Sequence, residues 1–273
     1  MLNALTIDVE DWYHICGMEN IFPPSKWDEY EDRVLIGLEK LLDILRAKKV
    51  KATFFILGYV AQRNPQVVKL IKKEGHEIAT HGYGHIQVYR QTKEEFKKDL
   101  RKSIKIIEKI SKNKIIGYRA PEWSIRKDTY WALDILEEEG LKYDSSILKV
   151  KLIGEPTVNR YPHKVKTKNG KIFEFPPTIM RTFMGNMPIA TGWGLRFGIW
   201  RDIKRTVRNL NKKGIPALFC IHPWEFDWEH PKVKLPFWRN FVHYTKLKST
   251  SYKLHKLLRE FEFGPIREVL EIR

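Results

Sequence analysis

Short apolar runs alternate along the chain with stretches whose apolar residues recur every three or four positions. The first pattern is typical of buried strands and the second of amphipathic helices. The predicted strands span residues 2–9, 51–57, 77–80, 115–118 and 217–221. The predicted helices span residues 32–49, 65–74, 92–111, 127–139, 200–213 and 245–262. This alternation predicts an α/β fold of parallel βαβ units, arranged in a barrel or in an open doubly wound sheet.

Two parts of the chain break the alternation. We expect residues 147–199 to form an insertion of loops and hairpins over one face of the sheet. After Phe226, an aromatic and proline-rich loop over 227–238 precedes the last helix. We therefore predict a barrel domain at residues 1–226 and a C-terminal helical extension at 227–273 that packs on it. The length of 273 residues is compatible with this, because α/β barrels often reach about 250 residues.

The composition is that of a globular protein, with 42% hydrophobic and 30% charged residues, which argues against a disordered chain. The two cysteines, Cys16 and Cys220, exclude a disulfide scaffold and a four-cysteine zinc site. The N-terminal residues show no basic leader, and the longest apolar stretch, 52–60, is far shorter than the roughly 20 residues that span a bilayer. We therefore expect a cytoplasmic protein without a transmembrane segment.

The net charge of +17 is unevenly distributed. Residues 146–216 contain 15 Lys and Arg but only three acidic residues. A basic surface favours anionic partners, namely nucleic acid, acidic lipid headgroups, or phosphorylated or acidic sugars. A lysine-rich surface that only promotes solubility is the simpler alternative.

Ionisable residues gather at five predicted strand ends, where parallel α/β folds place their functional side chains. These residues are Asp8, Glu10, Asp11, His81, His85, Arg119, Asp144 and His222. Loops elsewhere do not show this recurrence. The pattern predicts one functional site at that end of the barrel.

His81 and His85 are four residues apart, a spacing that lets two imidazoles face one metal ion. Asp8 and Glu10 share a face if the first strand continues, so that one would bind the metal and the other would act as a base. The alternatives are hydrogen-bonded loop histidines and carboxylates that cap a following turn or helix.

His222 follows a buried strand and precedes a proline, which places it at the rim of the sheet as a candidate general acid. A structural histidine packed by Trp224 is the alternative. Arg119 has three possible roles: it would pair with a carboxylate, bind an anion or lie on the surface. For Asp144, the alternative to a site residue is an ordinary turn residue. Cys220 is expected to be a small core residue rather than a nucleophile.

The order and spacing of five motifs resemble the polysaccharide deacetylase family, the carbohydrate esterases that include chitin and peptidoglycan deacetylases. The motifs are LTIDVE at 5–10, EIATHGYGH at 77–85, RAPEW at 119–123, YDSS at 143–146 and LFCIH at 218–222. The DVEDW and HPWE forms, and the tail around FVHY at 241–244 and residues 254–261, also resemble a branch of deacetylases associated with exopolysaccharide and exosortase gene clusters. The resemblance covers nearly the whole chain.

The resemblance implies a distorted (β/α) barrel of about seven parallel strands and a divalent metal ion, usually zinc. By position, His81 and His85 would bind the metal and Asp8 would be the catalytic base. The family more often has two adjacent aspartates, whereas this chain has DVED at 8–11. We assign Glu10 as the third metal ligand because it should share a face with Asp8, and Asp11 is its rival.

The resemblance also implies the remaining roles. Arg119 would tune Asp8, and His222, oriented by Asp144, would protonate the departing amine. The substrate-binding residues would be Pro121, Trp123 and Trp224. Aromatic rings suit the apolar faces of sugars, although ordinary core packing is the alternative for both tryptophans.

These residues together predict a metal-dependent hydrolase that removes an N-acetyl group from an N-acetylated sugar or polysaccharide. The basic stretch favours an anionic, lipid-linked or nucleotide-linked glycan and permits peripheral contact with a membrane. One alternative is an amidohydrolase of a small molecule such as allantoin or a cyclic imide, using the same site. Another is a non-catalytic basic module for nucleic acid or membranes, but no specific nucleic-acid-binding signature is evident. The oligomeric state is left open.

Overall fold

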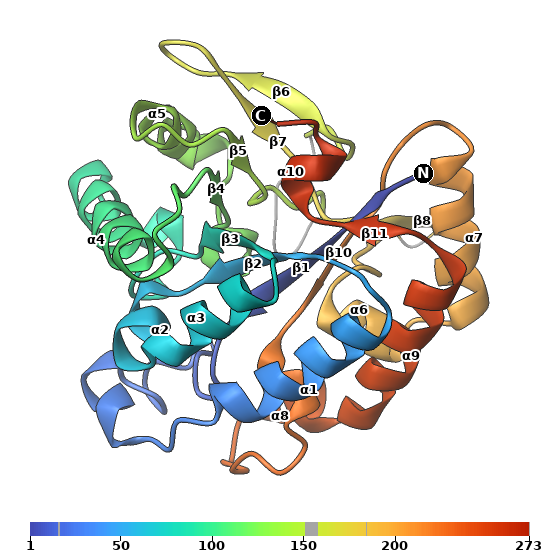
Figure 1. Ribbon diagram of the computed structural model, residues 1–273, viewed down its shortest axis with the longest axis horizontal. Helices are drawn as coiled ribbons and strands as arrows, with labels where there is room; N and C mark the ends of the chain where they lie inside the picture. The colour runs from blue at the N-terminus through green and yellow to red at the C-terminus, as the bar shows by residue number, and fades with distance from the viewer. Residues whose placement is uncertain (16, 151–157, 184, 273) are drawn as a thin grey trace.

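A curled sheet occupies the centre of the molecule, with helices packed around it (Figure 1). The structure, a computed structural model, describes residues 1–15, 17–150, 158–183 and 185–272. The strands are β1 (Asn3–Val9), β2 (Thr53–Ile56), β3 (Glu77–Thr80), β4 (Gly117–Tyr118), β5 (Tyr143–Asp144), β6 (His163–Lys166), β7 (Lys171–Glu174), β8 (Met180–Thr182), β9 (Gly185–Met187), β10 (Leu218–Ile221) and β11 (Phe263–Gly264).

Seven parallel strands follow one another in the order β10-β1-β2-β3-β4-β5-β7, with β6 antiparallel at the edge and β11 beside β1. The sheet curls until the segment after β7 meets β10, where the amide of Thr178 donates to the carbonyl of Leu218 over 3.1 Å. The central strand β1 is buried along its whole length, as its apolar run predicts. The predicted distorted barrel of about seven parallel strands is thus confirmed.

The six predicted helices form close to their predicted spans, and the described residues also form four α-helices that were not predicted, at 58–63, 192–197, 237–244 and 266–269. The α-helices are α1 (Val34–Ala47), α2 (Gly58–Arg63), α3 (Pro65–Lys73), α4 (Lys93–Ser111), α5 (Trp131–Glu138), α6 (Gly192–Phe197), α7 (Trp200–Asn211), α8 (Phe237–Tyr244), α9 (Leu247–Glu260) and α10 (Ile266–Val269). The 3-10 turns are η1 (Pro24–Glu29), η2 (Val88–Arg90), η3 (Pro121–Trp123), η4 (Lys127–Thr129) and η5 (Pro223–Phe226). Local sequence sets several ends: Thr92 and Glu95 form a capping box before α4, and Pro65 begins α3.

The expected insertion contains hairpins, but one of them belongs to the main sheet. β6 and β7 pair antiparallel, and β7 also lies parallel to β5, with Tyr143 opposite Phe173. The second hairpin, β8–β9, forms a separate sheet, and α6 follows it. Residues 151–157 and 184 of the predicted insertion lie outside the described residues.

The C-terminal extension packs on the barrel. β11 lies beside β1, with Asn3 opposite Phe263, and the amide of Ile266 donates to Thr53 Oγ1 over 2.7 Å. α8 begins inside the segment predicted as a loop over 227–238. The division of the chain at residue 226 stays a prediction. In the described part of the chain, every helix is too short or too polar to span a bilayer.

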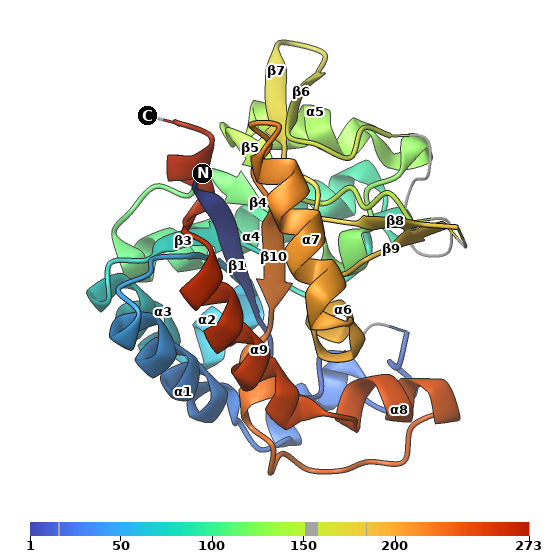
Figure 2. The same ribbon diagram turned by 90° about the vertical axis from the view of Figure 1, so that its right-hand side faces the viewer.

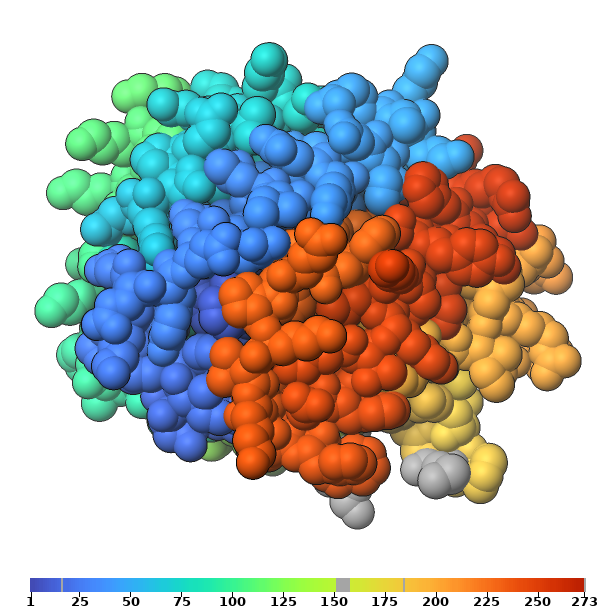
Figure 3. Space-filling model, turned by 90° about the horizontal axis from the view of Figure 1, so that it is seen from below, coloured from blue at the N-terminus to red at the C-terminus, as the bar shows by residue number. Residues whose placement is uncertain are grey.

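The carboxyl ends of β1 and β10 point to one face of the molecule, at the bottom of Figure 2. Two distant parts of the chain lie side by side on this face, the N-terminal segment in blue and the segment after β10 in orange (Figure 3). A salt bridge joins them, with Arg33 Nε 2.6 Å from Asp227 Oδ2. The loops that frame this face are therefore fixed to one another.

Gly37 allows α1 to pack closely against η5. A Cβ at this position would lie 1.9 Å from the carbonyl oxygen of Pro223. Alanine in a helix is otherwise more favourable than glycine by about 1 kcal/mol. Gly37→Ala should nevertheless lower the free energy of unfolding by about 1–3 kcal/mol, because α1 must move away from η5. Urea denaturation checks this, with exposed Glu39→Ala on the same helix as control, expected within about 0.5 kcal/mol of the parent. A Gly37→Ala variant more stable than the parent would contradict the close packing.

Candidate active site

Side chains from four strand ends converge on the face described above. Asp8 lies on β1 and Glu10 just after it, His81 follows β3, Arg119 follows β4 and His222 follows β10. Neighbouring parallel strands end at the same edge of the sheet, so residues far apart in sequence come together there. The structure thus brings these five predicted site residues into one cluster.

Glu10, His81 and His85 form a buried triad. Glu10 Oε1 lies 3.1 Å from Nε2 of His81 and 3.0 Å from Nε2 of His85. Nδ1 of His81 lies 2.7 Å from the carbonyl oxygen of Arg119, which can only accept a hydrogen bond, so Nδ1 carries the proton. With the proton on Nδ1, a neutral ring turns the lone pair of its Nε2 toward the carboxylate.

Two facing lone pairs require a proton or a metal cation between them. Burial raises the pKa of Glu10, but His85 and His222 outweigh burial and hold that pKa well below its ordinary value. The carboxylate therefore stays ionised. One carboxylate and two imidazoles form the protein donor set of many catalytic zinc sites. The triad fits the predicted divalent ion, with Glu10 as the carboxylate that contacts both histidines.

The loop that carries the two histidines is held by Asp99 on α4. Its carboxylate accepts hydrogen bonds from the amides of Tyr83 over 2.7 Å and Gly84 over 2.9 Å. Gly82 has φ +74°, and a Cβ there would lie 2.9 Å from that carboxylate. His85 itself has φ +52°, a backbone conformation that is uncommon for residues other than glycine. Asp99 was not predicted as a site residue, because nothing in the helical pattern separates it from a surface acid.

Asp11 caps a helix instead of joining the triad. Its Oδ2 accepts hydrogen bonds from the amides of Arg33 over 2.8 Å and Val34 over 3.0 Å, where α1 begins. Its Oδ1 accepts one from the amide of Trp12 over 2.8 Å. Burial raises the pKa of Asp11 to about 7 despite these hydrogen bonds. Both oxygens are thus used by amide donors, the capping role that the sequence analysis gave as an alternative for these acids.

Asp8 is paired with the buried guanidinium of Arg119. Nη1 of Arg119 lies 2.7 Å from Asp8 Oδ1, and Nη2 donates to Ser145 Oγ over 2.7 Å. Burial raises the pKa of Asp8, but Arg119, followed by His81 and His222, lowers it below the ordinary value. Asp8 is therefore ionised at neutral pH, as a general base must be.

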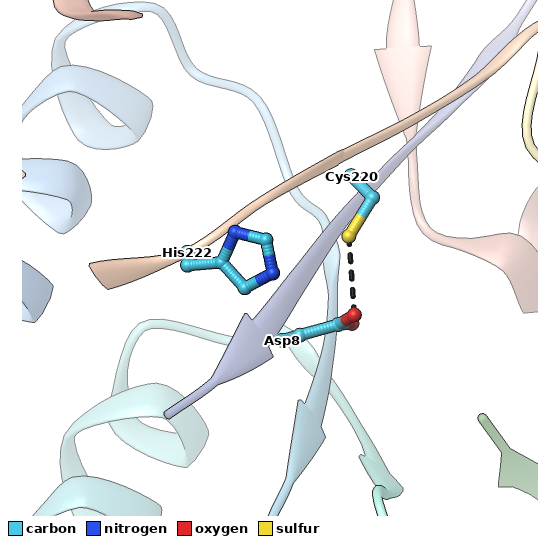
Figure 4. A group of neighbouring side chains, drawn as sticks. All are labelled: Asp8, Cys220 and His222. Atoms are coloured by element: carbon cyan, nitrogen blue, oxygen red, sulfur yellow. Dashed lines mark hydrogen bonds between the residues drawn. The ribbon is translucent and has the colours of Figure 1, made fainter. Parts of the chain in front are cut away.

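The other oxygen of Asp8 faces Cys220 and His222 (Figure 4). The Sγ of Cys220 lies 3.2 Å from Asp8 Oδ2. Cys220 and His222 are two residues apart along β10 and its extension, so their side chains point to the same side. Burial raises the pKa of the thiol well above its ordinary value. Cys220 is a buried neutral thiol, as expected, but it faces the site.

His222 is held by Glu225, so the prediction that Asp144 orients it is wrong. Nδ1 of His222 lies 2.8 Å from Glu225 Oε1, which also accepts the amide of His222 over 3.0 Å. Arg196 lies behind Glu225, with Nη1 3.4 Å from Oε2. Burial lowers the pKa of His222, but Glu10 and Glu225 outweigh it and raise the pKa to about 9. The three-residue spacing of a capping box was the available sequence signal for Glu225.

Asp144 instead supports the loop that carries Arg119. It accepts a hydrogen bond from Ser146 Oγ, which in turn accepts the amide of Ala120 over 2.7 Å. Glu174 lies opposite Asp144 on β7. Burial raises the pKa of Asp144 to about 6, and burial together with the charge of Asp144 raises the pKa of Glu174 well above its ordinary value. Burial and the neighbouring carboxyl group of Asp144 therefore favour the protonated form of Glu174.

The predicted substrate-binding residues differ in their surroundings. The ring of Trp224 stacks on His222, with centroids 5.3 Å apart. Trp123 is half-buried against a cluster that includes Leu148, and Pro121 is buried. Trp224 thus lies against the site, whereas Trp123 shows the packing given as its alternative.

A pocket of about 260 Å³ opens beside His85. Tyr13, Phe22 and Trp27 contribute aromatic walls to it, and Arg90 lies at its edge. These rings come from the irregular segment after β1, where no periodic pattern indicated a role. The aromatic walls of this pocket were therefore not predicted.

Two family models match consecutive parts of the chain. The model described as "Polysaccharide deacetylase" matches residues 32–143, and the model described as "Domain of unknown function (DUF3473)" matches residues 145–271. Over residues 32–143 the chain is thus similar to the polysaccharide deacetylase family. Of the site residues, His81, His85 and Arg119 lie within the first match, and His222 lies within the second.

Several curated relatives are similar to part of this chain. A peptidoglycan-N-acetylglucosamine deacetylase of Bacillus cereus is 39% identical over 82 residues, 30% of this chain and 38% of that protein. A peptidoglycan deacetylase of Helicobacter pylori is 29% identical over 113 residues, 41% of this chain and 38% of that protein. The chain spans about two fifths of the length of these relatives.

Solved structures share the fold over nearly the whole chain. A Mycobacterium smegmatis structure assigned to the polysaccharide deacetylases has a TM-score of 0.64 and 20% identity, covering 98% of this chain and 88% of that one. The structure of the allantoinase PuuE has a TM-score of 0.64 and 13% identity, and the match covers 98% of this chain and 88% of that one. At such low identity the likeness shows the fold alone.

The pairing of His222 with Glu225 predicts how the activity of this protein depends on pH. Glu225→Gln keeps the hydrogen-bond acceptor but removes the negative charge, so the pKa of His222 should fall. A reaction that needs protonated His222 is lost as the pH rises through that pKa. The alkaline limb of the activity profile should therefore move about one pH unit or more to lower pH. The measurement is the pH profile of parent and variant at equal metal content.

Glu229→Gln is the matched control, because it removes an exposed carboxylate from the same segment. Its alkaline limb should coincide with that of the parent. An unmoved limb in Glu225→Gln would show that Glu225 does not set the protonation of His222.

Proposed function

We propose that this protein is a metal-dependent hydrolase that removes the N-acetyl group from an N-acetylated sugar or glycan. The observation that carries the proposal is the meeting of three features at one edge of the barrel. They are the Glu10/His81/His85 triad, the ionised Asp8 and the protonated His222. Metal-dependent amide hydrolysis uses these three functions, namely an electrophilic ion, a base and an acid.

Glu10, His81 and His85 would hold the divalent ion, for which we propose zinc. Zinc prefers imidazole and carboxylate ligands and leaves a position open in catalytic sites. When bound, the ion would polarise the acetyl carbonyl and stabilise the negative charge that develops on its oxygen. Asp99 keeps the histidine loop in place, and the carbonyl of Arg119 keeps His81 in the required tautomer.

Asp8 and His222 would carry the proton transfers. Asp8 takes a proton from the attacking water, whose oxygen bonds to the acetyl carbon, while Oδ1 remains held by Arg119. His222 donates the proton on Nε2 to the sugar nitrogen as the C–N bond breaks, since Nδ1 is bound to Glu225. The products are acetate and the free amine, and the two residues exchange protonation states in the turnover.

The first test of this function is acetate release from N-acetylglucosamine oligomers by the zinc-loaded protein. Asp8→Asn and His222→Ala should each lower kcat by about 10²-fold to 10⁴-fold, because each removes one proton transfer. His81→Ala should lose the bound ion, which mass spectrometry of the purified protein measures. Circular dichroism shows whether the variants remain folded.

The control variant is Asp128→Asn, which neutralises an exposed acid in η4. Allantoin and a cyclic imide serve as contrasting substrates. Turnover of these, with none of the acetylated oligomers, would replace the glycan with a small-molecule amide. Unchanged acetate release in both Asp8→Asn and His222→Ala would refute the assigned roles.

We further propose that the substrate is presented at an anionic membrane surface. The outer side of α8 exposes Phe237, Trp238 and Phe241, at 75%, 73% and 40% of their surfaces. The helix lies at the same end of the molecule as the strand ends that carry the site (Figure 2). Its inner side carries His243, which stacks on Trp224 with ring centroids 4.4 Å apart. The helix that carries the exposed rings thus packs directly against Trp224, which stacks on His222.

The charges around α8 complement an acidic bilayer. Exposed basic residues surround the three rings in the sequence, namely Lys232, Lys234, Arg239, Lys246 and Lys248. Aromatic rings with lysine and arginine beside them are typical of segments that lie in the headgroup region. A lipid-linked glycan at such a surface would reach the site without leaving the membrane.

Co-sedimentation with phosphatidylglycerol vesicles tests this surface. The parent should bind these vesicles and release them at high salt, and it should bind phosphatidylcholine vesicles weakly. Changing Phe237 and Trp238 together to alanine should weaken binding about tenfold or more. Tyr252→Ala, which removes an exposed ring on α9, is the control. Equal binding of parent and double variant would contradict the proposal.

A further inference from the structure

We propose that Asp8, Cys220 and His222 form a second site for a thiophilic divalent cation such as Zn²⁺, and that its occupation inhibits the enzyme. The site differs from the Glu10/His81/His85 triad in its ligands and in its consequence. The inhibitory consequence rests on the proposed function, whereas the binding itself does not.

The backbone brings the three donors together. β1 and β10 are parallel neighbours, with Thr6 opposite Cys220 and Ile7 opposite Ile221. Continuing this register places Asp8 beside His222, and residues two apart on each strand share a face. Figure 4 shows one ring nitrogen of His222 turned toward the Asp8 carboxylate and the Cys220 sulfur. The three donors therefore line one side of two paired strands.

The distances suit a metal ion. One ligand atom from each of the three residues lies within 4.8 Å of the others. The Sγ of Cys220 lies 3.2 Å from Asp8 Oδ2, whereas tetrahedral zinc with ordinary bond lengths separates sulfur and oxygen ligands by about 3.5 Å. The sulfur–oxygen distance is therefore within a few tenths of an ångström of the tetrahedral value. Imidazole, carboxylate and thiolate are all donors that zinc accepts.

The remaining atoms of these side chains are already held in place. Asp8 Oδ1 is bound by Arg119, and Nδ1 of His222 is bound by Glu225. This leaves Asp8 Oδ2, the Nε2 of His222 and the thiol to face the same small volume. Supporting contacts of this kind orient ligands in established metal sites.

Occupation of this site would stop both proposed proton transfers. A cation bound to Asp8 Oδ2 removes the lone pair that accepts the proton of water. A cation bound to Nε2 of His222 displaces the proton needed by the leaving amine. The guanidinium of Arg119 lies against the same carboxylate and disfavours a second positive charge. We therefore infer that the site binds less tightly than the triad and fills only after it.

Cobalt distinguishes the two sites without any turnover. Ligation by thiolate gives Co²⁺ an intense near-ultraviolet charge-transfer band, whereas the triad contains no sulfur ligand. The parent should bind one equivalent of Co²⁺ without this band and a second, weaker equivalent with it. Cys220→Ala and Cys220→Ser should bind the first equivalent and lack the band, and Cys16→Ser, which changes the other cysteine, should retain it.

Zinc titration of acetate release tests the inhibition. Excess Zn²⁺ should inhibit the parent. The inhibition of each protein is measured relative to its own activity at one equivalent of zinc. On that scale, each Cys220 variant should need at least about tenfold more zinc than the parent for the same fractional inhibition. Absence of the band in the parent, or its persistence in both Cys220 variants, would overturn the site. A protein that shows the band but releases no acetate would refute the proposed deacetylation and leave the second site standing.

Discussion

The guanidinium of Arg119 is fully buried. The ion pair and hydrogen bonds that compensate its charge fix the positions of several site residues. Asp8 provides the opposite charge, while Thr6 and Ser145 accept hydrogen bonds from its remaining donors. Its backbone carbonyl fixes the tautomer of His81. Removing one partner of a buried ion pair costs about 3–5 kcal/mol, because the other charge is left without compensation. The proposed base is therefore tied to the stability of the barrel as well as to its chemistry.

The charges around the site set opposite protonation states on its two proton carriers. Asp8 stays ionised beside Arg119, while Glu10 and Glu225 hold a proton on His222. Pairs of titratable groups whose surroundings push their pKa values apart are typical of acid and base partners. The same negative charges make this end of the barrel attractive to cations, although the molecule as a whole is strongly basic.

The site spans both matched family segments. The segment at 32–143 contributes His81 and Arg119, whereas the segment at 145–271 contributes His222 with its partner Glu225. β1, which carries Asp8, precedes both of them. Since β10 and β11 flank β1 in the sheet, the C-terminal half completes the barrel as well as the proton-transfer pair.

The sequence by itself determined the parallel strands and the residues at their ends. Buried strands and amphipathic helices leave periodic apolar patterns, and the common direction of parallel strands brings their ends to one edge. The positions of LTIDVE, HGYGH and LFCIH at strand ends therefore indicated Asp8, His81 and His222 as site residues from the sequence alone.

Only the tertiary structure decided which neighbours these residues have. The choice of Glu10 over Asp11 depended on where α1 begins, because its amides use the Asp11 carboxylate. The pairing of His222 with Glu225, and the role of Asp99 on a distant helix, depended on contacts between elements. Periodicity reports which face of an element is buried. It contains no information on which hydrogen-bond donors and charges meet across that face, because packing of the whole chain sets those distances.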